Sequence, residues 1–577
     1  MNKTHNSSEH LLHLLHAHQH QHHFISDDAI SDIALQLNLP RAQVEAVTEF
    51  YSFFHRTPRG RYDILFSNCT SCGSLLLMRQ LCEQLDVNPG ETRIDRMISV
   101  DETSCIGMCD HGASALINGR PMTSMTSDRI KKIAKLIEAE DGIDTWPPEW
   151  FVIDDHLQRS DLLLSSSFKP GSALKVMEEE GCDASLEKIR FSELRGRGGA
   201  GFSTAQKWQF CREAEGDAHY VICNADEGEP GTFKDRVLLS SYADTVFEGM
   251  SICARIIGAK RGIVYLRGEY RYLLEQLESR LAKRREERLL GESILDVEGF
   301  DFDISIVVGA GAYICGEESA LIESLEQKCG NPRIRPPFPV TSGYLGQPTV
   351  VNNVETLAAA AGVVIHDSHW FRGAGTWQSR GSKILSVSGD CARPGIYEYL
   401  FGITIRQVLD ECGADDVQAV QVGGPAGRLI DPTHFDHQIA FEDIATGGSF
   451  MIYDQSHDLL KIILGFSRFF AHESCGFCTP CRVGTTLLKN TMEKICHGHG
   501  TAHDLDELRR VAALVGRRSH CGLGFTAPNP IIDGLKYFPE LFEARLLNRE
   551  VEPEFDLDAS LEEARQLTNR DDAEAHL

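Results

Sequence analysis

The spacing of apolar residues along the chain predicts which stretches are helical and which are extended. Between residues 27 and 54, apolar side chains recur every three to four positions, which is the period of an amphipathic helix. Residues 61–140 instead alternate short apolar runs with helical stretches. The expected strands are 62–66 and 113–117, and the expected helices are 75–85 and 128–139. The patterns predict a small helical module over 1–60 and a second module of strands and helices over 61–140.

The same alternation continues over a longer stretch, residues 173–375. The expected strands are 219–223, 262–266 and 303–308, and the expected helices are 243–257 and 270–289. Repeated strand–helix units favour a mostly parallel sheet covered by helices, whose ligands collect where the strands end. We therefore expect a Rossmann-like domain here.

The remaining segments have different patterns. Residues 376–455 alternate strands with one helix, as in a β-grasp (ubiquitin-like) module, whereas residues 456–548 carry the apolar stripes of a helical bundle. Residues 141–172 contain two adjacent prolines and no clear period, which indicates a linker, and residues 549–577 are a polar tail. The expected fold class is multidomain α/β.

Composition narrows the possible functions. The 577 residues carry a formal net charge of −27, which argues against nucleic acid and acidic membrane surfaces as partners. No run of about 18 apolar residues occurs and the N-terminus has no cleavable-signal pattern, so we expect a cytoplasmic protein with no direct membrane insertion. In a reducing compartment the 18 cysteines favour metal binding and packing over disulfides.

Seven histidines lie between His10 and His23, interleaved with leucines. We interpret them as the solvated face of an entry helix. A nickel- or zinc-binding tract is the alternative.

Two segments of the 173–375 domain are candidates for a cofactor site. Residues 195–202 hold four glycines within six positions, which lets a flat or phosphorylated ligand approach the main chain. The second segment follows the strand expected at 219–223 and supplies one amide and three carboxylates. These residues are Asn224, Asp226, Glu227 and Glu229. Carboxylates at that edge suit ribose hydroxyls and flavin N–H groups, which are donors.

With these motifs the chain resembles the flavin-binding subunit shared by respiratory complex I, NAD-reducing hydrogenases and NAD-dependent formate dehydrogenases. The resemblance rests on Gly-Arg-Gly-Gly-Ala-Gly-Phe at 196–202, Lys-Trp at 207–208 and Asn-Ala-Asp-Glu-x-Glu-Pro-Gly-Thr-Phe-Lys-Asp at 224–235. A second glycine-rich turn, residues 309–318, also matches the family. The resemblance implies that the cofactors are FMN and NAD(H).

The resemblance further implies which residues hold these cofactors. They are Arg197, Gly198, Gly199, Ala200, Gly201, Phe202, Lys207, Asn224, Asp226, Glu227, Glu229, Tyr313, Gly316, Glu317, Glu318, Arg335, Phe338, Asn352, Asn353 and Thr356. Glu317 is expected near flavin and nicotinamide, with no residue acting as a general acid or base. Glu318 is expected to receive the adenosine ribose hydroxyls and to repel a 2′-phosphate, which predicts NAD over NADP. Phe202 and Phe338 are expected to stack the adenine, and the helix that begins after Asn353 suits the FMN phosphate.

Cysteine spacing predicts an iron–sulfur site near the C-terminus. Cys475, Cys478 and Cys481 are separated by two residues each, and Cys521 lies further along the chain. Three closely spaced cysteines and one distant cysteine are typical of a [4Fe–4S] site. Zinc is the alternative, although zinc sites favour two separated pairs.

A second cysteine group lies in the 61–140 module. Cys69, Cys72, Cys105 and Cys109 could supply the four thiolates of a [2Fe–2S] centre, and the stretch resembles the thioredoxin-like ferredoxin subunit of the same complexes. The family usually separates the first two cysteines by four residues, a register that matches Cys72 but places Ser67 at the earlier position. Cys69 could substitute for the missing cysteine, the site could have three cysteines, or the cluster could be absent. A disulfide between Cys69 and Cys72 is the remaining alternative.

These features together predict a diaphorase that passes electrons between NAD(H), FMN and iron–sulfur clusters. Fusion of the ferredoxin-like and flavin modules favours a subunit of a soluble NAD-reducing hydrogenase. Its partners would be an iron–sulfur electron-transfer subunit and a hydrogenase module. The alternatives are the equivalent subunit of an NAD-dependent formate dehydrogenase or of a respiratory NADH dehydrogenase, and a flavin-free electron-relay or assembly subunit.

Overall fold

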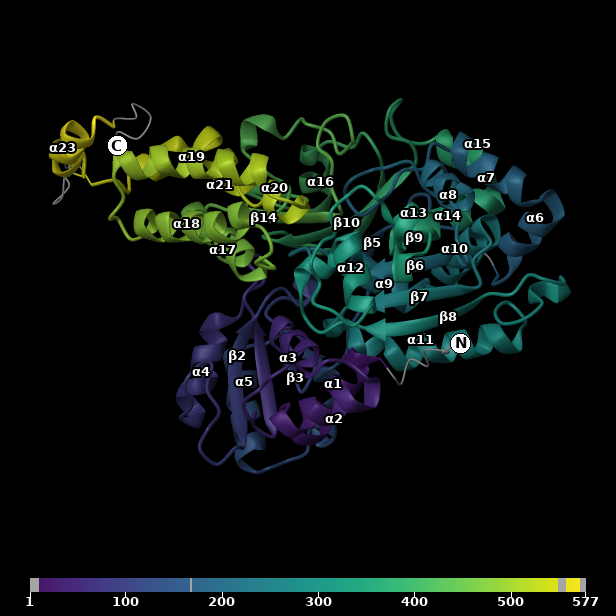
Figure 1. The fold of residues 1–577 in the computed structure, drawn as a ribbon, viewed down its shortest axis with the longest axis horizontal. Helices are drawn as coiled ribbons and strands as arrows, with labels where there is room; N and C mark the ends of the chain where they lie inside the picture. The colour runs from purple at the N-terminus through teal and green to yellow at the C-terminus, as the bar shows by residue number, and fades with distance from the viewer. Residues whose placement is uncertain (1–9, 167–168, 548–556, 571–577) are drawn as a thin grey trace.

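Three β-sheets organise the protein in the computed structural model, which describes residues 10–166, 169–547 and 557–570. In Figure 1 the N-terminal sheet and its helices lie below the central parallel sheet, and the C-terminal helices extend to one side. The first nine residues and most of the tail expected at 549–577 lie outside the described residues. Within the described ranges, no helix is long and apolar enough to cross a membrane.

The N-terminal sheet has the strand order β2-β1-β3-β4. Its strands are β1 (Tyr62–Ser67), β2 (Ile98–Thr103), β3 (Ala115–Ile117) and β4 (Arg120–Met122), and the helices that pack beside it are α4 (Leu75–Leu85) and α5 (Ser127–Glu138). β1 runs parallel to β2 and antiparallel to β3, and its alternate residues Tyr62, Ile64 and Phe66 are buried. β2 was not expected, because only its first half is apolar.

The interpretation of the histidine tract as a solvated face is wrong for its first half. Three helices precede the sheet: α1 (Leu11–His22), α2 (Asp27–Leu37) and α3 (Arg41–Phe50). Side chains of α1 and of its N-terminal cap form hydrogen bonds with main-chain groups of residues 173–375, the flavin domain. His10 bonds with Leu325 O at 3.1 Å, His13 with Val308 N at 3.3 Å and His16 with Gly309 O at 3.0 Å. Because Leu11, Leu12 and Leu15 are buried, this helix docks through its leucine face and the early histidines bind backbone groups at the seam.

The central sheet is parallel throughout, with the order β8-β7-β6-β9. Its strands are β6 (Tyr220–Ala225), β7 (Arg261–Leu266), β8 (Asp303–Val308) and β9 (Thr349–Asn353). α10 (Ala243–Ile257) packs on α14 (Val354–His366), and both contact β6. Since all four strands run the same way, the loops that follow them meet at one edge of the sheet.

The third sheet has the order β13-β12-β14-β10-β11-β5 and combines residues 382–454 with a strand from the stretch expected to be a linker. Its strands are β10 (Ser382–Gly389), β11 (Gly395–Leu400), β12 (Val417–Val422), β13 (Arg428–Ile430), β14 (Ser449–Asp454) and β5 (Leu157–Arg159), with α16 (Ile405–Cys412) after β11. The buried carboxylate of Glu398 accepts hydrogen bonds from the N–H groups of residues 161–164. The main chain of residues 161–164 is therefore held by the Glu398 carboxylate. A contact of this kind produces no hydrophobic periodicity, so the sequence pattern did not predict it.

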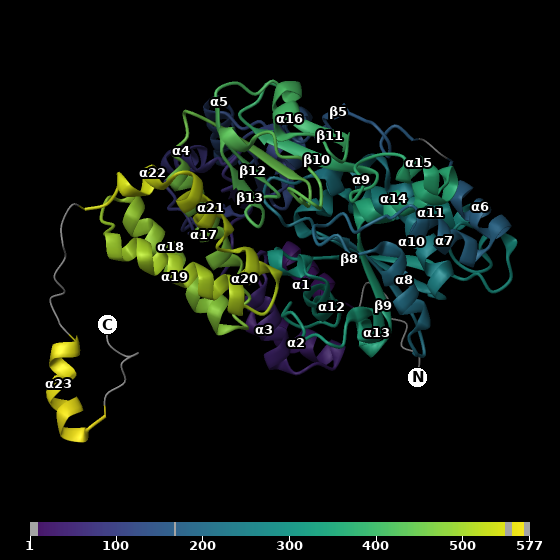
Figure 2. The ribbon, with the colours of Figure 1, turned by 90° about the horizontal axis from the view of Figure 1, so that it is seen from above.

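Helices fill the region from residue 459 to residue 543. They are α17 (Leu459–Glu473), α18 (Thr479–Cys496), α19 (Ala502–Arg518), α20 (Gly522–Thr526), α21 (Asn529–Tyr537) and α22 (Pro539–Glu543). α18 packs on α17 and α19, while α17 also packs on α21. Figure 2 shows these helices together, with α23 (Leu557–Thr568) set apart from them. The turn into α20 brings Cys521 beside the start of α18.

Candidate functional site

The glycine-rich loop lies against the N-terminal end of α14. The N–H of Arg197 donates to Thr356 Oγ1 at 2.9 Å, and a Cβ at Gly198 would stand 3.3 Å from Asn353 Cβ. Gly201 has a φ of +65°, a conformation that side chains rarely adopt. Gly198, Ala200 and Phe202 are exposed, so alternate residues of the loop face outward beside the helix N-terminus.

Three side chains expected to touch a cofactor also bind protein groups. The Arg197 guanidinium is buried against Phe371, Phe401 and Phe441 and donates to Arg380 O. Asn352 accepts a hydrogen bond from Trp208 Nε1 at 2.8 Å. The Glu227 carboxylate accepts from Thr232, from the N–H groups of Asp235 and Arg236, and from the Tyr270 hydroxyl. These contacts fix the loops around the three residues, while the buried Nη1 of Arg197 has no hydrogen-bond partner among the residues that the structure describes.

Other predicted residues meet at the carboxyl edge of the central sheet. Asn224 Nδ2 donates to Gly316 O at 2.8 Å, which joins the loop after β6 to the second glycine-rich turn. Glu229 accepts hydrogen bonds from Tyr313 OH at 2.6 Å and Ala426 N at 2.8 Å. Burial raises the pKa of Glu229 to about 7 and raises the pKa of Asp226 well above its usual value. Burial thus favours the neutral form of both carboxyl groups.

Two adjacent carboxylates begin α12 (Glu318–Leu325). Glu317 Oε2 accepts from the N–H groups of Ser319 and Ala320, which caps the helix. Glu318 Oε2 lies 2.7 Å from Lys207 Nζ, and Glu318 Oε1 lies 3.6 Å from Arg335 Nη1. Two cations thus surround the carboxylate expected to select NAD, a feature that the sequence alone did not show.

The donor chemistry at this edge fits a flavin and a nicotinamide nucleotide. Asp226 Oδ2 is a buried acceptor without a hydrogen-bond partner among the residues that the structure describes, and Glu317 Oε1 has only an ion pair, 3.3 Å from Arg335 Nη1. Ring N–H groups and ribose hydroxyls are donors that would satisfy such atoms. Phe202 and Phe338 are 51% and 52% exposed, which leaves their rings free to stack on a flat ligand.

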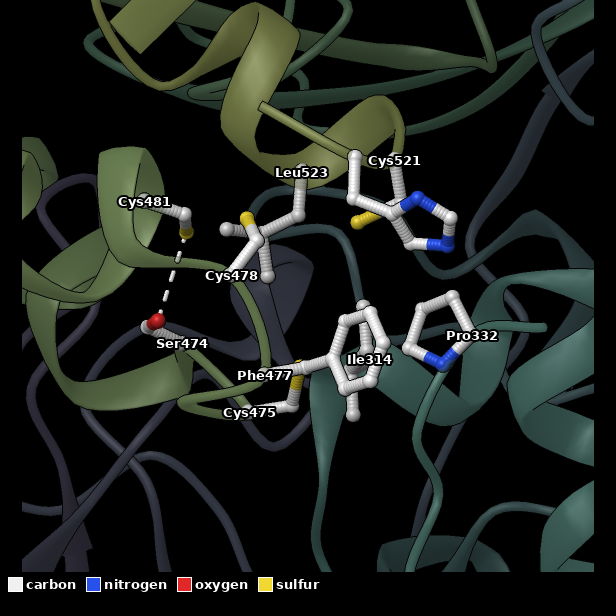
Figure 3. Close-up of a pocket in the computed structure, with 10 residues that line it drawn as sticks. Ile314, Pro332, Ser474, Cys475, Phe477, Cys478, Cys481, Cys521 and Leu523 are labelled. Carbon is white, nitrogen blue, oxygen red and sulfur yellow. Dashed lines mark hydrogen bonds between the residues drawn. The ribbon is translucent and has the colours of Figure 1, made fainter. Parts of the chain in front are cut away.

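The four C-terminal cysteines line one pocket (Figure 3). Cys475 and Cys478 lie on the loop between α17 and α18, Cys481 lies in the first turn of α18, and Cys521 caps α20. Burial raises the pKa of Cys481 and of Cys521 to about 11. The other lining residues are Ile314, Pro332, Ser474, Phe477, His520 and Leu523. Four thiols around a mostly apolar pocket fit an iron–sulfur cluster, whose binding would displace the thiol protons.

The N-terminal cysteines also converge, and Cys69 rather than Ser67 joins them. Cys109 Sγ lies 3.2 Å from Cys105 Sγ and 3.8 Å from Cys69 Sγ, and Cys69, Cys72 and Cys109 form one close group. Hydrogen bonds from Cys105, Cys109 and Cys72 hold the pKa of Cys69 well below its usual value. Ser67 stays in β1, fully buried, and its hydroxyl accepts from the Cys69 N–H. All 18 cysteines lie within the described ranges and none of them forms a disulfide, so the Cys69–Cys72 disulfide alternative is wrong for this structure.

Several residues around the site were not predicted from the sequence. Lys383 of β10 binds Glu355 in the first turn of α14, where Lys234 also pairs with Glu355 at 3.1 Å. Glu473 accepts from Ser104 Oγ at 2.7 Å and from Tyr313 N at 3.0 Å, which links both cysteine regions to the second glycine-rich turn. These contacts join residues far apart in the sequence, so only folding shows them.

Family comparisons agree with this division of the site. Residues 1–138 match the thioredoxin-like [2Fe-2S] ferredoxin family, residues 189–361 match the Nuo51 FMN-binding domain, and residues 461–545 match the iron–sulfur binding region of NADH-ubiquinone oxidoreductase-F. The chain is therefore a multidomain α/β protein with a thioredoxin-like [2Fe–2S] module and an FMN-binding domain.

Comparison with whole proteins narrows the class to one family. The chain is 42% identical over 563 residues to the NAD-reducing hydrogenase HoxS alpha subunit of Cupriavidus necator, across 94% of this chain and 93% of that one. A solved NAD+-reducing [NiFe]-hydrogenase in the H2-reduced state matches with a TM-score of 0.89 and 44% identity over 98% of this chain and 97% of the other. An NADH-quinone oxidoreductase protein of Escherichia coli is 38% identical, but the match spans 63% of this chain and 84% of the other. The chain belongs to the family of NAD-reducing hydrogenase alpha subunits.

Proposed function

We propose that the chain is the diaphorase subunit of an NAD-reducing hydrogenase, in which electrons pass between NAD(H), FMN and iron–sulfur clusters. The Cupriavidus necator alpha subunit matches nearly the whole chain, whereas the match to the Escherichia coli quinone oxidoreductase protein spans less than two thirds of it. This difference favours the hydrogenase assignment over the respiratory one. A cytoplasmic location suits the 18 cysteines, all of which are free thiols.

One observation carries the proposal: the second glycine-rich turn, residues 309–318, also lines the C-terminal cysteine pocket. Tyr313 donates its hydroxyl proton to Glu229 in the loop after β6, and the next residue, Ile314, lines the pocket with Cys475 and Cys521. Two consecutive residues therefore join the flavin edge to the cluster ligands. A short path of this kind is what electron transfer between a flavin and a cluster requires.

The protein groups at the edge hold and orient ligands. Bound FMN supplies the conversion between a two-electron hydride and single electrons. Glu318 would accept the ribose hydroxyls, Phe202 and Phe338 would stack the adenine, and the N–H groups at the start of α14 would face the FMN phosphate. Gly198, Gly199, Ala200 and Gly201 would lie against the flavin. The chain's residues would bind and orient the two cofactors, and hydride chemistry between them would need no general base from the protein.

Both cysteine groups are proposed as cluster sites. Cys475, Cys478, Cys481 and Cys521 would bind a [4Fe–4S] cluster, and Cys69, Cys72, Cys105 and Cys109 would bind a [2Fe–2S] cluster. The proximity of Cys69 to Cys109 supports Cys69 as the fourth ligand of the second site.

The surroundings of the C-terminal pocket suit an iron–sulfur partner protein. Phe477 lines it and is about half exposed, as are Val483 and Leu487 on α18 and Phe525 on α20, the helices that carry Cys481 and follow Cys521. Exposed apolar groups of this size around a redox site favour a docked protein. We propose that the partner carrying electrons to a hydrogenase module binds here.

We further propose that residues 376–455 form a β-grasp module and residues 456–548 a cluster-bearing bundle. The order β11-β10-β14-β12-β13, with a β10–β11 hairpin before α16, supports the first assignment. Contacts of α18 with α17 and α19 support the second.

An absorption spectrum of the purified chain, followed by NADH addition, tests the proposed function. A flavin band that bleaches with NADH, together with iron–sulfur absorption, is the expected result. Cluster absorption without flavin would instead identify an electron-relay subunit. The absence of both signals would contradict both assignments. NADPH serves as the matched control, because Glu318 should reject its 2′-phosphate.

A further inference from the structure

Two buried arginines of the flavin domain reach the second cysteine loop of the N-terminal module. Arg236 donates to Gly107 O at 3.0 Å, and Arg267, the residue after β7, donates to Cys105 O. They are 0% and 4% exposed. Two positive charges therefore lie beside one proposed cluster ligand loop, at the seam between two domains.

The charge of Arg236 is closely compensated. Its two terminal nitrogens bind the two carboxylate oxygens of Asp110 at 3.0 and 2.8 Å, and the Asp110 side chain is fully buried. A paired, forked contact of this kind leaves little net field at a distance. Arg236 therefore acts mainly as a structural clamp.

Arg267 is arranged differently. One nitrogen donates to Glu227 O at 2.8 Å in the predicted flavin loop, and the other donates both to Cys105 O and to Glu269 Oε1, the latter at 2.7 Å. Glu269 thus binds through one oxygen, while its Oε2 is buried with no hydrogen-bond partner in the described part of the chain. The Arg267 guanidinium therefore lies between the loop that holds Glu227 and the loop that holds Cys105. Its counter-charge, the Glu269 carboxylate, binds only one of its nitrogens.

Reduction adds one negative charge to a [2Fe–2S] centre. A positive group near the centre stabilises the reduced form, whereas a negative group destabilises it, and burial strengthens both effects because the local dielectric is low. Arg267 is a buried positive group that donates to the Cys105 carbonyl, so it would stabilise the reduced centre. The negative charge of Glu269 would have the opposite effect.

We propose that Arg267 and Glu269 are positioning residues that set the reduction potential of the N-terminal [2Fe–2S] centre, Arg267 raising it and Glu269 lowering it. This inference rests on the proposed function, since it requires that the centre be present. It assigns to the flavin domain, rather than to the ferredoxin-like module itself, the control of how readily that centre takes an electron.

The test is a redox titration of the whole complex with dithionite and mediator dyes, followed by electron paramagnetic resonance of the [2Fe–2S] signal. R267Q should lower the potential, so that the ratio of reduced to oxidised centre at a fixed potential falls on the order of tenfold. R267K retains the positive charge, so its reduction potential should fall less than that of R267Q. E269Q removes the opposing carboxylate at nearly constant volume and should shift the potential upward. R255Q is the control, because Arg255 pairs with Glu178 at 2.8 Å elsewhere in the flavin domain.

Opposite shifts in R267Q and E269Q support the inference, because a purely structural role would not give opposite signs. Equal potentials in all variants, or shifts in one direction, overturn it. If R267Q fails to retain the centre, E269Q alone decides, and an unchanged potential in E269Q overturns the inference. Absence of any [2Fe–2S] signal from the unmodified complex would instead overturn the proposed cluster, while a retained NADH-reducible flavin would leave the diaphorase assignment standing.

Discussion

The two cysteine sites differ in what surrounds them. In the N-terminal group, Cys69, Cys105 and Cys109 are no more than 5% exposed, Cys72 is partly exposed, and two buried arginines bond to the Cys105 loop. In the C-terminal group, Cys481 and Cys521 are buried, Cys475 and Cys478 are partly exposed, and the neighbouring Phe477 is 52% exposed. Under the proposed function, this difference favours the C-terminal site as the point at which electrons leave the chain.

The largest effect is expected from C478A. Removing this ligand should eliminate the [4Fe–4S] cluster and stop electron transfer to the partner complex, while NADH still reduces the flavin, because the proposed nicotinamide contacts lie in residues 195–236 and 309–356. Dyes that accept electrons directly from flavin should still be reduced. C496A on α18 is the control, since its thiol only donates to Leu460 O. Partner transfer at the parent rate in a flavin-replete C478A complex would show that this cluster lies off the route.

A second variant tests the identity of the ligand in the other site. C69S should reduce the iron content from about six to about four atoms per chain, because Cys69 and not Ser67 lies with the other thiols. S67A is the matched control and should retain about six iron atoms. The assignment of Cys69 is wrong if C69S keeps a full [2Fe–2S] signal or if S67A loses it.

How much of these sites the sequence predicts depends on the range of the contacts. The cysteine spacing at 475–481 and the strand–helix alternation at 219–308 are local, and the structure has the expected strands and a common cysteine pocket. The cofactor role expected of Glu227 stays a prediction, and its carboxylate also binds the N-terminus of α9 (Lys234–Ser241), a capping role that residue type alone does not show. The expectations for the early histidines and for the stretch of β5 were wrong, since their partners lie more than 200 residues away.

The pH dependence of stability should reveal the carboxyl group between the flavin edge and the C-terminal pocket. Burial raises the folded-state pKa of Glu229 from 4.5 to about 7, so the protonated form stabilises the fold. This contribution is complete below about pH 4.5 and is lost as the pH rises through 7, a change of at most about 3 kcal/mol. E229Q should flatten the fall in unfolding temperature between pH 5 and pH 8, measured by calorimetry on the flavin-depleted chain. An unchanged slope would assign the pH dependence to other groups.

A smaller effect is expected from E318Q. The substitution removes the charge that repels a 2′-phosphate, while Lys207 and Arg335 stay beside the site through Val351 O and Glu317 and can attract one. The preference for NADH over NADPH, as a ratio of kcat/KM, should fall on the order of 10- to 100-fold, or about 1.4–2.8 kcal/mol. E323Q on the same helix is the control, because Glu323 pairs with Arg333. An unchanged ratio in E318Q would place the selection at another residue.

The comparison of the two cysteine sites is tested most directly by freeze-quench electron paramagnetic resonance of the C69S complex after mixing with NADH. We expect the [4Fe–4S] cluster and the clusters of the partner protein to become reduced at the parent rate although the [2Fe–2S] signal is missing. Slow or absent reduction of the partner clusters, in a complex with full flavin and [4Fe–4S] content, would instead place the N-terminal site on the main route of electrons.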